Sequence, residues 1–331
     1  MRRRLALHLR PAAFRHSRAL LSSILVPLVP VILCIGTGYL IARVGWVRAA
    51  AVPDLSNIVF LLLTPALLFR TMGQVHLQEL DFRPVGLYFA SAALLFGATL
   101  AWAPFTTATA ARALAHTFSN TVMIGVPLIS LVYGPAGLVT LFTLVSLHSL
   151  VLLTAATLVF ELAQARAGAD DGHSMARTVW QAVRGSIVHP VPLPILAGLL
   201  FAQTGLPLPE VVDKPLQMLG AALGPMALLL VGIALAHTRI GAHWRGALRI
   251  AAIKNLVMPS TLAALAWALG LSGPAVAVMF TASALPVGAN VLYFTQRYGV
   301  MQEEVSSAIA ISTALALATV PLALAAARLF M

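Results

Sequence analysis

The sequence predicts an all-α membrane protein of ten transmembrane helices, in a five-plus-five inverted repeat with broken fourth and ninth helices. Of its 331 residues, 60% are hydrophobic and 9% are charged, whereas soluble domains carry about 25% charged residues. Apolar runs of about 20 residues, long enough to cross about 30 Å of hydrocarbon, recur from Leu25 onward. A central polar stretch divides these runs into two groups of five. Proline and glycine interrupt the fourth run of each group.

Glycine, proline and charged residues mark the ends of the ten segments. The segments are residues 24–42, 54–72, 85–104, 112–133, 136–162, 187–204, 212–236, 246–270, 274–296 and 303–329. Around them we expect a basic N-terminal tail at residues 1–23, a first five-helix repeat at 24–162, a central polar loop at 163–186, and a second five-helix repeat at 187–331.

Short matches in the same order relate the two halves. "VPLVPVILCIGTG" from Val26 resembles "VPLPILAGLLFAQTG" from Val191, at an offset of 165 residues. The Tyr-Gly pair that begins at Tyr133 recurs at Tyr298 with that same offset. An odd number of helices per half gives the two halves opposite orientations in the membrane, an arrangement typical of secondary transporters.

The net charge of +11 comes from basic residues spread over the connections and the N-terminal region. Such a distribution indicates membrane topology and contact with lipid headgroups, not nucleic-acid binding. Arginines in the connections favour an outside N-terminus and a cytoplasmic central loop, whereas the arginine-rich N-terminal tail favours the opposite. Cys34 is the single cysteine, which excludes an intrachain disulfide and a cysteine-based metal site. We expect a multi-pass protein of the cell membrane without a metal or cofactor.

Two helix breaks point to a binding site. Gly125 and Pro127 interrupt the fourth segment, and Pro286 and Gly288 interrupt the ninth. A proline inside a helix costs about 3 kcal/mol or more, and unsatisfied backbone in hydrocarbon costs several kcal/mol further. Such breaks survive only inside protein or beside water, and paired breaks in corresponding helices mark the binding sites of transporters.

Asn120 and Asn290 flank the two breaks and add neutral hydrogen-bond donors and acceptors. Free backbone groups and the positive ends of half-helices bind an anion without a buried formal charge. We therefore expect the two breaks to form a site for a small organic anion.

Four motifs resemble the auxin efflux carrier family, which includes bacterial malonate and malate carriers and plant auxin exporters. They are "SNTVMIGVPL" followed by "YG", "TPALLF", "KNLVMP" and "ASALPVGANVLYFTQRYG". The resemblance extends from about Leu25 to Arg328. It implies that the fourth and ninth helices unwind and cross, that a mobile bundle moves against a scaffold bundle in an elevator-like motion, and that many members are homodimers. It also implies substrates such as dicarboxylates or indole-3-acetate.

The resemblance carries over to individual positions. Asn120 and Pro127 match the first crossover of the family, and Pro286 and Asn290 match the second. Ser119 stands where many members have glycine, which affects the geometry expected for the substrate. The predicted substrate-binding residues are Asn120, Asn290, Ser119, Gly125, Gly288 and Lys254, with Pro127 and Pro286 shaping the crossover backbone.

Two further polar residues have alternative roles. Lys254 either extends to the cytoplasmic face or acts as an interior cation that attracts the substrate, and its match to the "K…P" of the family's eighth helix places it among the predicted site residues. His148 either carries a coupling proton or forms a hydrogen bond inside the bundle.

These features predict an efflux carrier for a small organic anion. Outward movement of one negative charge across an inside-negative membrane gains about 2.3 kcal/mol per 100 mV, so coupling to an ion is not required for export. The alternatives are a sodium- or proton-coupled symporter of the bile-acid transporter type and a membrane sensor without flux. An enzyme is not expected, because no nucleophile elbow, zinc-protease motif or phosphate-binding loop is present.

Overall fold

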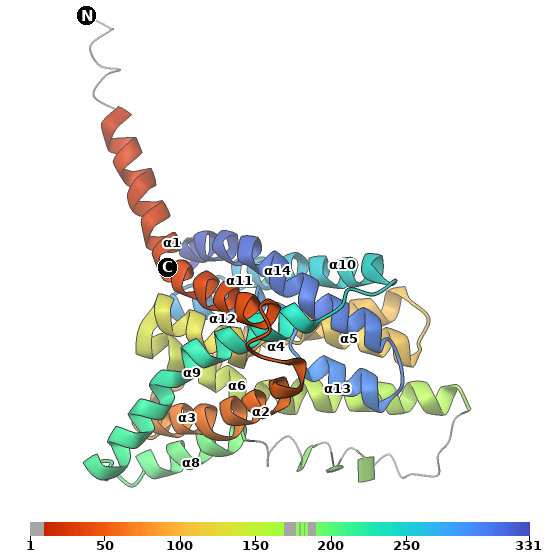
Figure 1. Ribbon diagram of the computed structural model, residues 1–331, viewed down its shortest axis with the longest axis horizontal. Helices are drawn as coiled ribbons and strands as arrows, with labels where there is room; N and C mark the ends of the chain where they lie inside the picture. Colours follow the sequence, from red (N-terminus) through yellow and green to blue (C-terminus); the bar gives the residue numbers. More distant parts are fainter. Residues whose placement is uncertain (1–9, 169–176, 179, 182, 185–189) are drawn as a thin grey trace, which may run out of the picture.

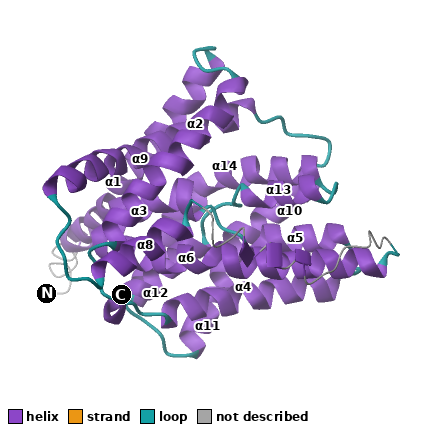
Figure 2. Ribbon diagram, turned by 90° about the horizontal axis from the view of Figure 1, so that it is seen from below, coloured by secondary structure: helices purple, strands orange, loops and turns teal. Residues whose placement is uncertain are grey.

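The computed structural model describes residues 10–168, 177–178, 180–181, 183–184 and 190–331. This part of the chain consists of helices joined by loops and turns and contains no β-strand (Figure 2). Half of the predicted central loop at residues 163–186 lies outside the described residues. The all-helical class expected from the sequence is confirmed for the described residues.

The helices of the first half follow the predicted segments closely. They are α1 (Arg10–Arg43), α2 (Val52–Ile58), α3 (Thr64–Met72), α4 (Arg83–Trp102), α5 (Thr107–Thr117) and α6 (Val126–Arg166). α1 already begins within the stretch expected to be a tail, and α5 begins before the predicted residue 112. Gly134 has φ 64° and ψ −158°, which turns the chain inside α6 just before Pro135 and separates the fourth segment from the fifth.

The second half contains α8 (Pro192–Ala202), α9 (Glu210–His237), α10 (Trp244–Ala252), α11 (Met258–Ala268), α12 (Pro274–Ser283), α13 (Asn290–Arg297) and α14 (Gln302–Ala327). Among the described residues, six helical stretches are long and apolar enough to cross a membrane: Ala49–Met72, Arg83–Trp102, Thr121–Arg166, Glu210–His237, Trp244–Ala268 and Gln302–Phe330. Shorter apolar helices occupy Leu28–Arg43, Pro192–Ala202 and Pro274–Ser283.

Three five-residue π-helical turns each end two residues before a proline. They are Val59–Leu63 before Pro65, Thr121–Gly125 before Pro127, and Ile253–Val257 before Pro259. Proline lacks an N–H and its ring clashes with the carbonyl of the preceding turn. A wider turn directly before the proline relieves this clash, so the segments through Pro65, Pro127 and Pro259 all stay helical across it. The expectation that Gly125 and Pro127 interrupt the fourth segment is therefore wrong, because this segment is interrupted at residues 118–120.

The helices pack as two groups. The first group contains α1, α2, α3, α8 and α9, and the second contains α4, α5, α6, α10, α11, α12 and α14. Figure 1 shows α3, α8 and α9 together at the lower left of the molecule. The two groups meet chiefly where α6 and the π-helical turn before it contact α1, α3, α8 and α9.

Glycines allow the backbones of the first group to touch. A Cβ atom on Gly38 of α1 would overlap the carbonyl oxygen of Leu229 of α9, and one on Gly232 of α9 would overlap the carbonyl oxygen of Ile35. α1 and α9 therefore cross in direct backbone contact.

A second glycine contact joins α3 to α8. A Cβ on Gly198 of α8 would lie 2.7 Å from the carbonyl oxygen of Phe69 and 2.9 Å from the nitrogen of Gly73. Arg70 of α3 also forms a salt bridge of 2.7 Å with Asp213 of α9. These contacts make α1, α3, α8 and α9 one closely packed unit.

Candidate functional site

The fourth and ninth segments are both interrupted in mid-course. α5 ends at Thr117 and helical structure resumes at Thr121, whereas α12 ends at Ser283 and α13 begins at Asn290. Non-helical backbone is tolerated at membrane depth only inside protein or beside water. The backbone groups freed at these breaks therefore need partners.

The two interruptions supply many of these partners to each other. Two backbone hydrogen bonds of 2.9 Å join them, from Asn120 N–H to Pro286 O and from Gly288 N–H to Phe118 O. Between these bonds, Ser119 and Val287 form an isolated antiparallel bridge. The two broken helices thus meet through a very short strand-like contact between distant parts of the chain.

Glycine is required where the interruptions approach most closely. A Cβ atom on Gly288 would lie 2.7 Å from Cδ1 of Phe118 and 3.0 Å from the carbonyl oxygen of Ser119. A Cβ on Gly125 would lie 2.8 Å from Cδ1 of Leu285. Both glycines therefore permit the close contact of the two breaks.

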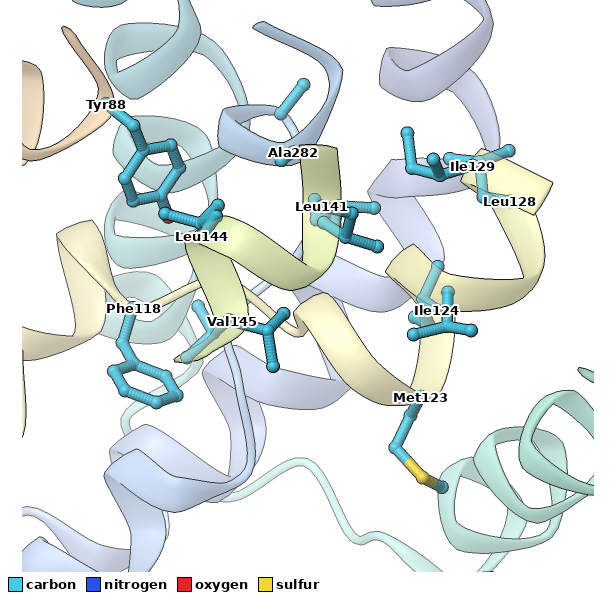
Figure 3. Packing of buried hydrophobic residues seen from close by; sticks show 14 of the residues in the cluster. Tyr88, Phe118, Met123, Ile124, Leu128, Ile129, Leu141, Leu144, Val145 and Ala282 are labelled. Atoms are coloured by element: carbon cyan, nitrogen blue, oxygen red, sulfur yellow. The ribbon is translucent and has the colours of Figure 1, made fainter. Parts of the chain in front are cut away.

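Apolar side chains surround this contact. Figure 3 shows Phe118 before the first break and Met123 and Ile124 after it, with Val145 of α6 between them in this view. All four side chains are buried. The polar backbone of the break is therefore enclosed in protein.

A cavity of about 50 Å³ lies beside the paired breaks. Asn120 and Asn290 both line it, and so do Gly288 and His148. Its remaining wall includes residues of the other helix group, among them Phe60 of the turn before α3. Because one water molecule occupies about 30 Å³ in the liquid, the cavity in this conformation holds one or two waters.

The positive ends of two half-helices border this cavity. Asn120 lies directly before the helix that starts at Thr121, and its Oδ1 accepts a hydrogen bond of 3.2 Å from the N–H of Met123. Asn290 is the first residue of α13. Helix N-termini carry partial positive charge and unpaired N–H groups, so the cavity favours a negatively charged group.

Lys254 contacts the opposite, negative end of a half-helix. Its side chain is fully buried, and Nζ donates hydrogen bonds of 2.7 Å to the carbonyl oxygens of Ser283 and Leu285 at the end of α12. The lysine does not reach a membrane face, and it is absent from the residues that line the cavity. It supports the second break by compensating carbonyl groups that the interrupted helix leaves free.

Tyr88 of α4 supports the first break, and it is not among the residues predicted from the sequence. Its hydroxyl donates a hydrogen bond of 2.8 Å to Oγ of Ser119 and lies 3.1 Å from Nε2 of His148. The ring of His148 packs against Phe118 with 4.4 Å between the ring centroids. The sequence offers only a general reason to select Tyr88, because any tyrosine hydroxyl inside an apolar helix needs a hydrogen-bond partner.

Ser119 also lines the cavity, whereas Gly125, Pro127 and Pro286 lie around it. Pro286 contributes its carbonyl oxygen to the backbone pairing, and Gly125 contacts Leu285. Pro127 lines a second cavity of about 390 Å³, together with residues of α1, α3 and α9. In the described part of the chain, no group of three or more His, Cys, Asp or Glu side chains is arranged to hold a metal ion.

Comparison with known proteins identifies the family of this chain. A family model described as "Membrane transport protein" matches residues 23–324. A curated relative is "Auxin efflux carrier component 8" of Arabidopsis thaliana, which is 24% identical over 241 residues, or 60% of this chain and 66% of the plant protein. The chain thus spans slightly less than two thirds of that relative.

The apolar helices and the family match identify the chain as a multi-pass membrane protein of a transport family. The chain belongs to the auxin efflux carrier family of membrane transport proteins.

Proposed function

We propose that the protein is a secondary transporter that exports a small organic anion across the cell membrane by alternating access. The observation that carries this proposal is the cavity shared by Asn120 and Asn290. Two positive helix ends and two amide side chains face one small volume, and no buried carboxylate lines it. A dicarboxylate or an auxin-like acid matches this polarity, and a neutral site also allows the anion to leave.

The negative helix ends strengthen the preference for anions. Lys254 donates to carbonyl groups at the end of α12, and the N–H of Gly288 donates to the carbonyl oxygen of Phe118 just after the end of α5. The carbonyl ends that would attract a cation are thus partly satisfied, whereas the N–H ends border the cavity. Electrostatics therefore favours an anion over a cation.

A movement of one helix group against the other would reconcile the small volume of the cavity with an organic anion as substrate. The present volume of about 50 Å³ is too small for a dicarboxylate. Phe60 and Val191 form part of its wall and belong to the group of α3 and α8, whereas the breaks belong to the other group. Displacing one group against the other would enlarge the cavity, as an elevator-like mechanism requires.

An inverted repeat of five plus five helices is part of this proposal. Gly134 and Gly299, at the sequence offset of 165 residues, both have positive φ, 64° and 65°. The glycine contact between α1 and α9, the first and seventh segments, also has a counterpart between α8 and α3, the sixth and second segments. Corresponding segments would make corresponding contacts if the two halves share a fold. A homodimer remains an expectation from the family.

Flux into and out of proteoliposomes tests the function. Labelled malonate, malate and indole-3-acetate are offered under a potassium-clamped membrane potential. We expect saturable flux of at least one anion, accelerated by a potential that drives negative charge in the direction measured. Binding without flux would favour a sensor, and flux of cations alone would refute the assignment.

A proton-coupled symporter is the second candidate, because His148 lines the cavity and contacts Tyr88, which in turn contacts Ser119. Protonation of this histidine would change the hydrogen bonds at the break. Under this alternative, an imposed pH gradient drives concentrative uptake, and His148→Gln abolishes the pH-gradient dependence while passive exchange persists. A sodium gradient tests the other form of coupling in the same vesicles.

A further inference from the structure

Another cavity, lined by several basic residues, shares no lining residue with the cavity at the two breaks. It has a volume of about 770 Å³ and is formed by α5, by α10 with the loop before it, and by the start of α14. Three arginines line it: Arg112, Arg245 and Arg249. Neither the predicted transport site nor its support uses these residues.

The positive charge in this cavity is not neutralised by the protein around it. Within the described ranges, no salt bridge joins any of the three arginines to a carboxylate. Glu304 is the one acidic residue in the lining, and its carboxylate packs directly against Gly246. Three arginines and one glutamate leave a net positive cavity, a composition suited to an anion.

The neighbouring side chains indicate where this cavity lies relative to the membrane. Arg245 stacks over the ring of Trp244, with 5.5 Å from Cζ to the ring centroid, and Trp244 is 47% exposed. Leu248 is also exposed, one helical turn further along α10. Tryptophan and arginine next to exposed apolar residues are typical of the headgroup level of a bilayer.

The depth of the cavity allows it to hold a whole headgroup. His116, 6% exposed, lines the cavity two residues before the first break begins at Phe118, and its Nδ1 lies 3.0 Å from Oγ1 of Thr99. At the other end, Arg245 and Trp244 are exposed. Arg112 lies about one and a half helical turns beyond the start of α5, which places a guanidinium below the mouth of the cavity.

We propose that Arg112, Arg245 and Arg249 form a binding site for a phosphate group, supplied by the headgroup of an anionic phospholipid or by a soluble phosphate compound. Guanidinium groups bind phosphate oxygens through paired, charge-assisted hydrogen bonds. Basic pockets between membrane helices bind anionic headgroups on the cytoplasmic side, where the arginine distribution places these connections. A bound phosphate would connect α5, α10 and the start of α14.

Binding of defined lipids to the full-length protein in neutral detergent tests this site. Native mass spectrometry counts bound short-chain phosphatidylglycerol and phosphatidylcholine, and the thermal unfolding midpoint is followed as each lipid, or inorganic phosphate, is titrated. We expect phosphatidylglycerol to bind more tightly than phosphatidylcholine. Each of Arg112→Gln and Arg249→Gln should weaken its binding about fivefold, and the double variant about 25-fold.

The matched control is Arg48→Gln, an exposed arginine in the connection between α1 and α2, which should leave binding unchanged. Inorganic phosphate that binds with the same dependence on arginine would support the site with a soluble ligand as its source. The proposal is overturned if both lipids bind equally, or if the double variant binds phosphatidylglycerol and phosphate as the wild type does. The unfolding midpoints of the two single variants and the double variant are first compared with that of the wild type in the absence of ligand. None of these readouts depends on transport.

Discussion

The backbone N–H of Asn120 donates a hydrogen bond of 2.9 Å to the carbonyl oxygen of Pro286. This bond joins the first helix break to the second, so a polar group freed in one half of the chain is satisfied by the other half. The same contact brings Asn120 and Asn290 to one cavity. The properties of the proposed site therefore depend on both halves together.

Replacement of either asparagine should abolish most of the flux. Loss of a hydrogen bond to a charged group costs about 1.5–3 kcal/mol, so Asn120→Ala and Asn290→Ala should each lower flux at least about tenfold in proteoliposomes. Asn57→Ala changes an exposed asparagine of α2 and should leave flux unchanged.

Asn120→Asp separates the role of the amide in binding from its role at the helix end. An aspartate keeps an acceptor for the N–H of Met123 and remains a good N-cap residue, but its negative charge repels an anionic substrate. We expect a wild-type unfolding midpoint with little flux. Full transport by this variant would show that the substrate does not approach Asn120.

Gly288→Ala should disrupt the contact between the two breaks. The new methyl group would lie 2.7 Å from the ring of Phe118, and overpacking of this kind costs about 1–3 kcal/mol. A lower unfolding midpoint and slower flux are expected. Gly86→Ala is the matched control, because nothing lies within 4 Å of a Cβ at this position of α4; a destabilisation equal to that of Gly288→Ala would contradict the proposed cause.

Lys254→Met tests whether the buried lysine supports the fold or binds the substrate. Its removal leaves two buried carbonyl oxygens without this donor, at a cost of about 1–3 kcal/mol for each. We expect a marked fall in thermal stability. Lys214→Met, at an exposed lysine paired with Glu210, should change stability little. A stable Lys254→Met protein with only a raised KM would instead assign the lysine to the substrate.

Two glycines of α1 provide a sharp test of the packing against α9. Gly38→Leu would place its side chain into the backbone of α9 at Leu229, whereas nothing lies within 4 Å of a Cβ on Gly36. We expect Gly38→Leu to prevent stable folding and Gly36→Leu to be tolerated, as judged by the yield of monodisperse protein in detergent. Similar yields from the two variants would show that α1 and α9 can separate.

The sequence predicted the helices well because apolar length and proline or glycine breaks are local signals. The second break lies at Pro286 as expected, whereas the first lies at residues 118–120, before Gly125 and Pro127, and the helix runs on through both of them. The structure brings the neighbouring asparagines to one cavity. That these asparagines bind substrate stays a prediction. The site residues that were missed, such as Tyr88, depend on contacts between distant helices, which no local pattern encodes.

Lys254 is the clearest example of a residue whose role depends on contacts with a distant helix. A lysine next to an apolar helix predicts either a side chain that reaches the membrane face or an interior cation, and its partners decide between them. Those partners are carbonyl groups of α12, freed by a break about thirty residues further along the chain. Only the packing of α12 against the turn that carries Lys254 reveals this role.

The hydrogen bonds between the breaks also constrain how the chain is made. Phe118 and Asn120 are made well before their backbone partners at residues 286–288, which follow more than 160 residues later in synthesis. Until then, the nascent first half holds polar peptide groups that hydrocarbon cannot satisfy. Insertion must keep this region in contact with water or with the translocation machinery, so neither half on its own can mature into a stable membrane protein.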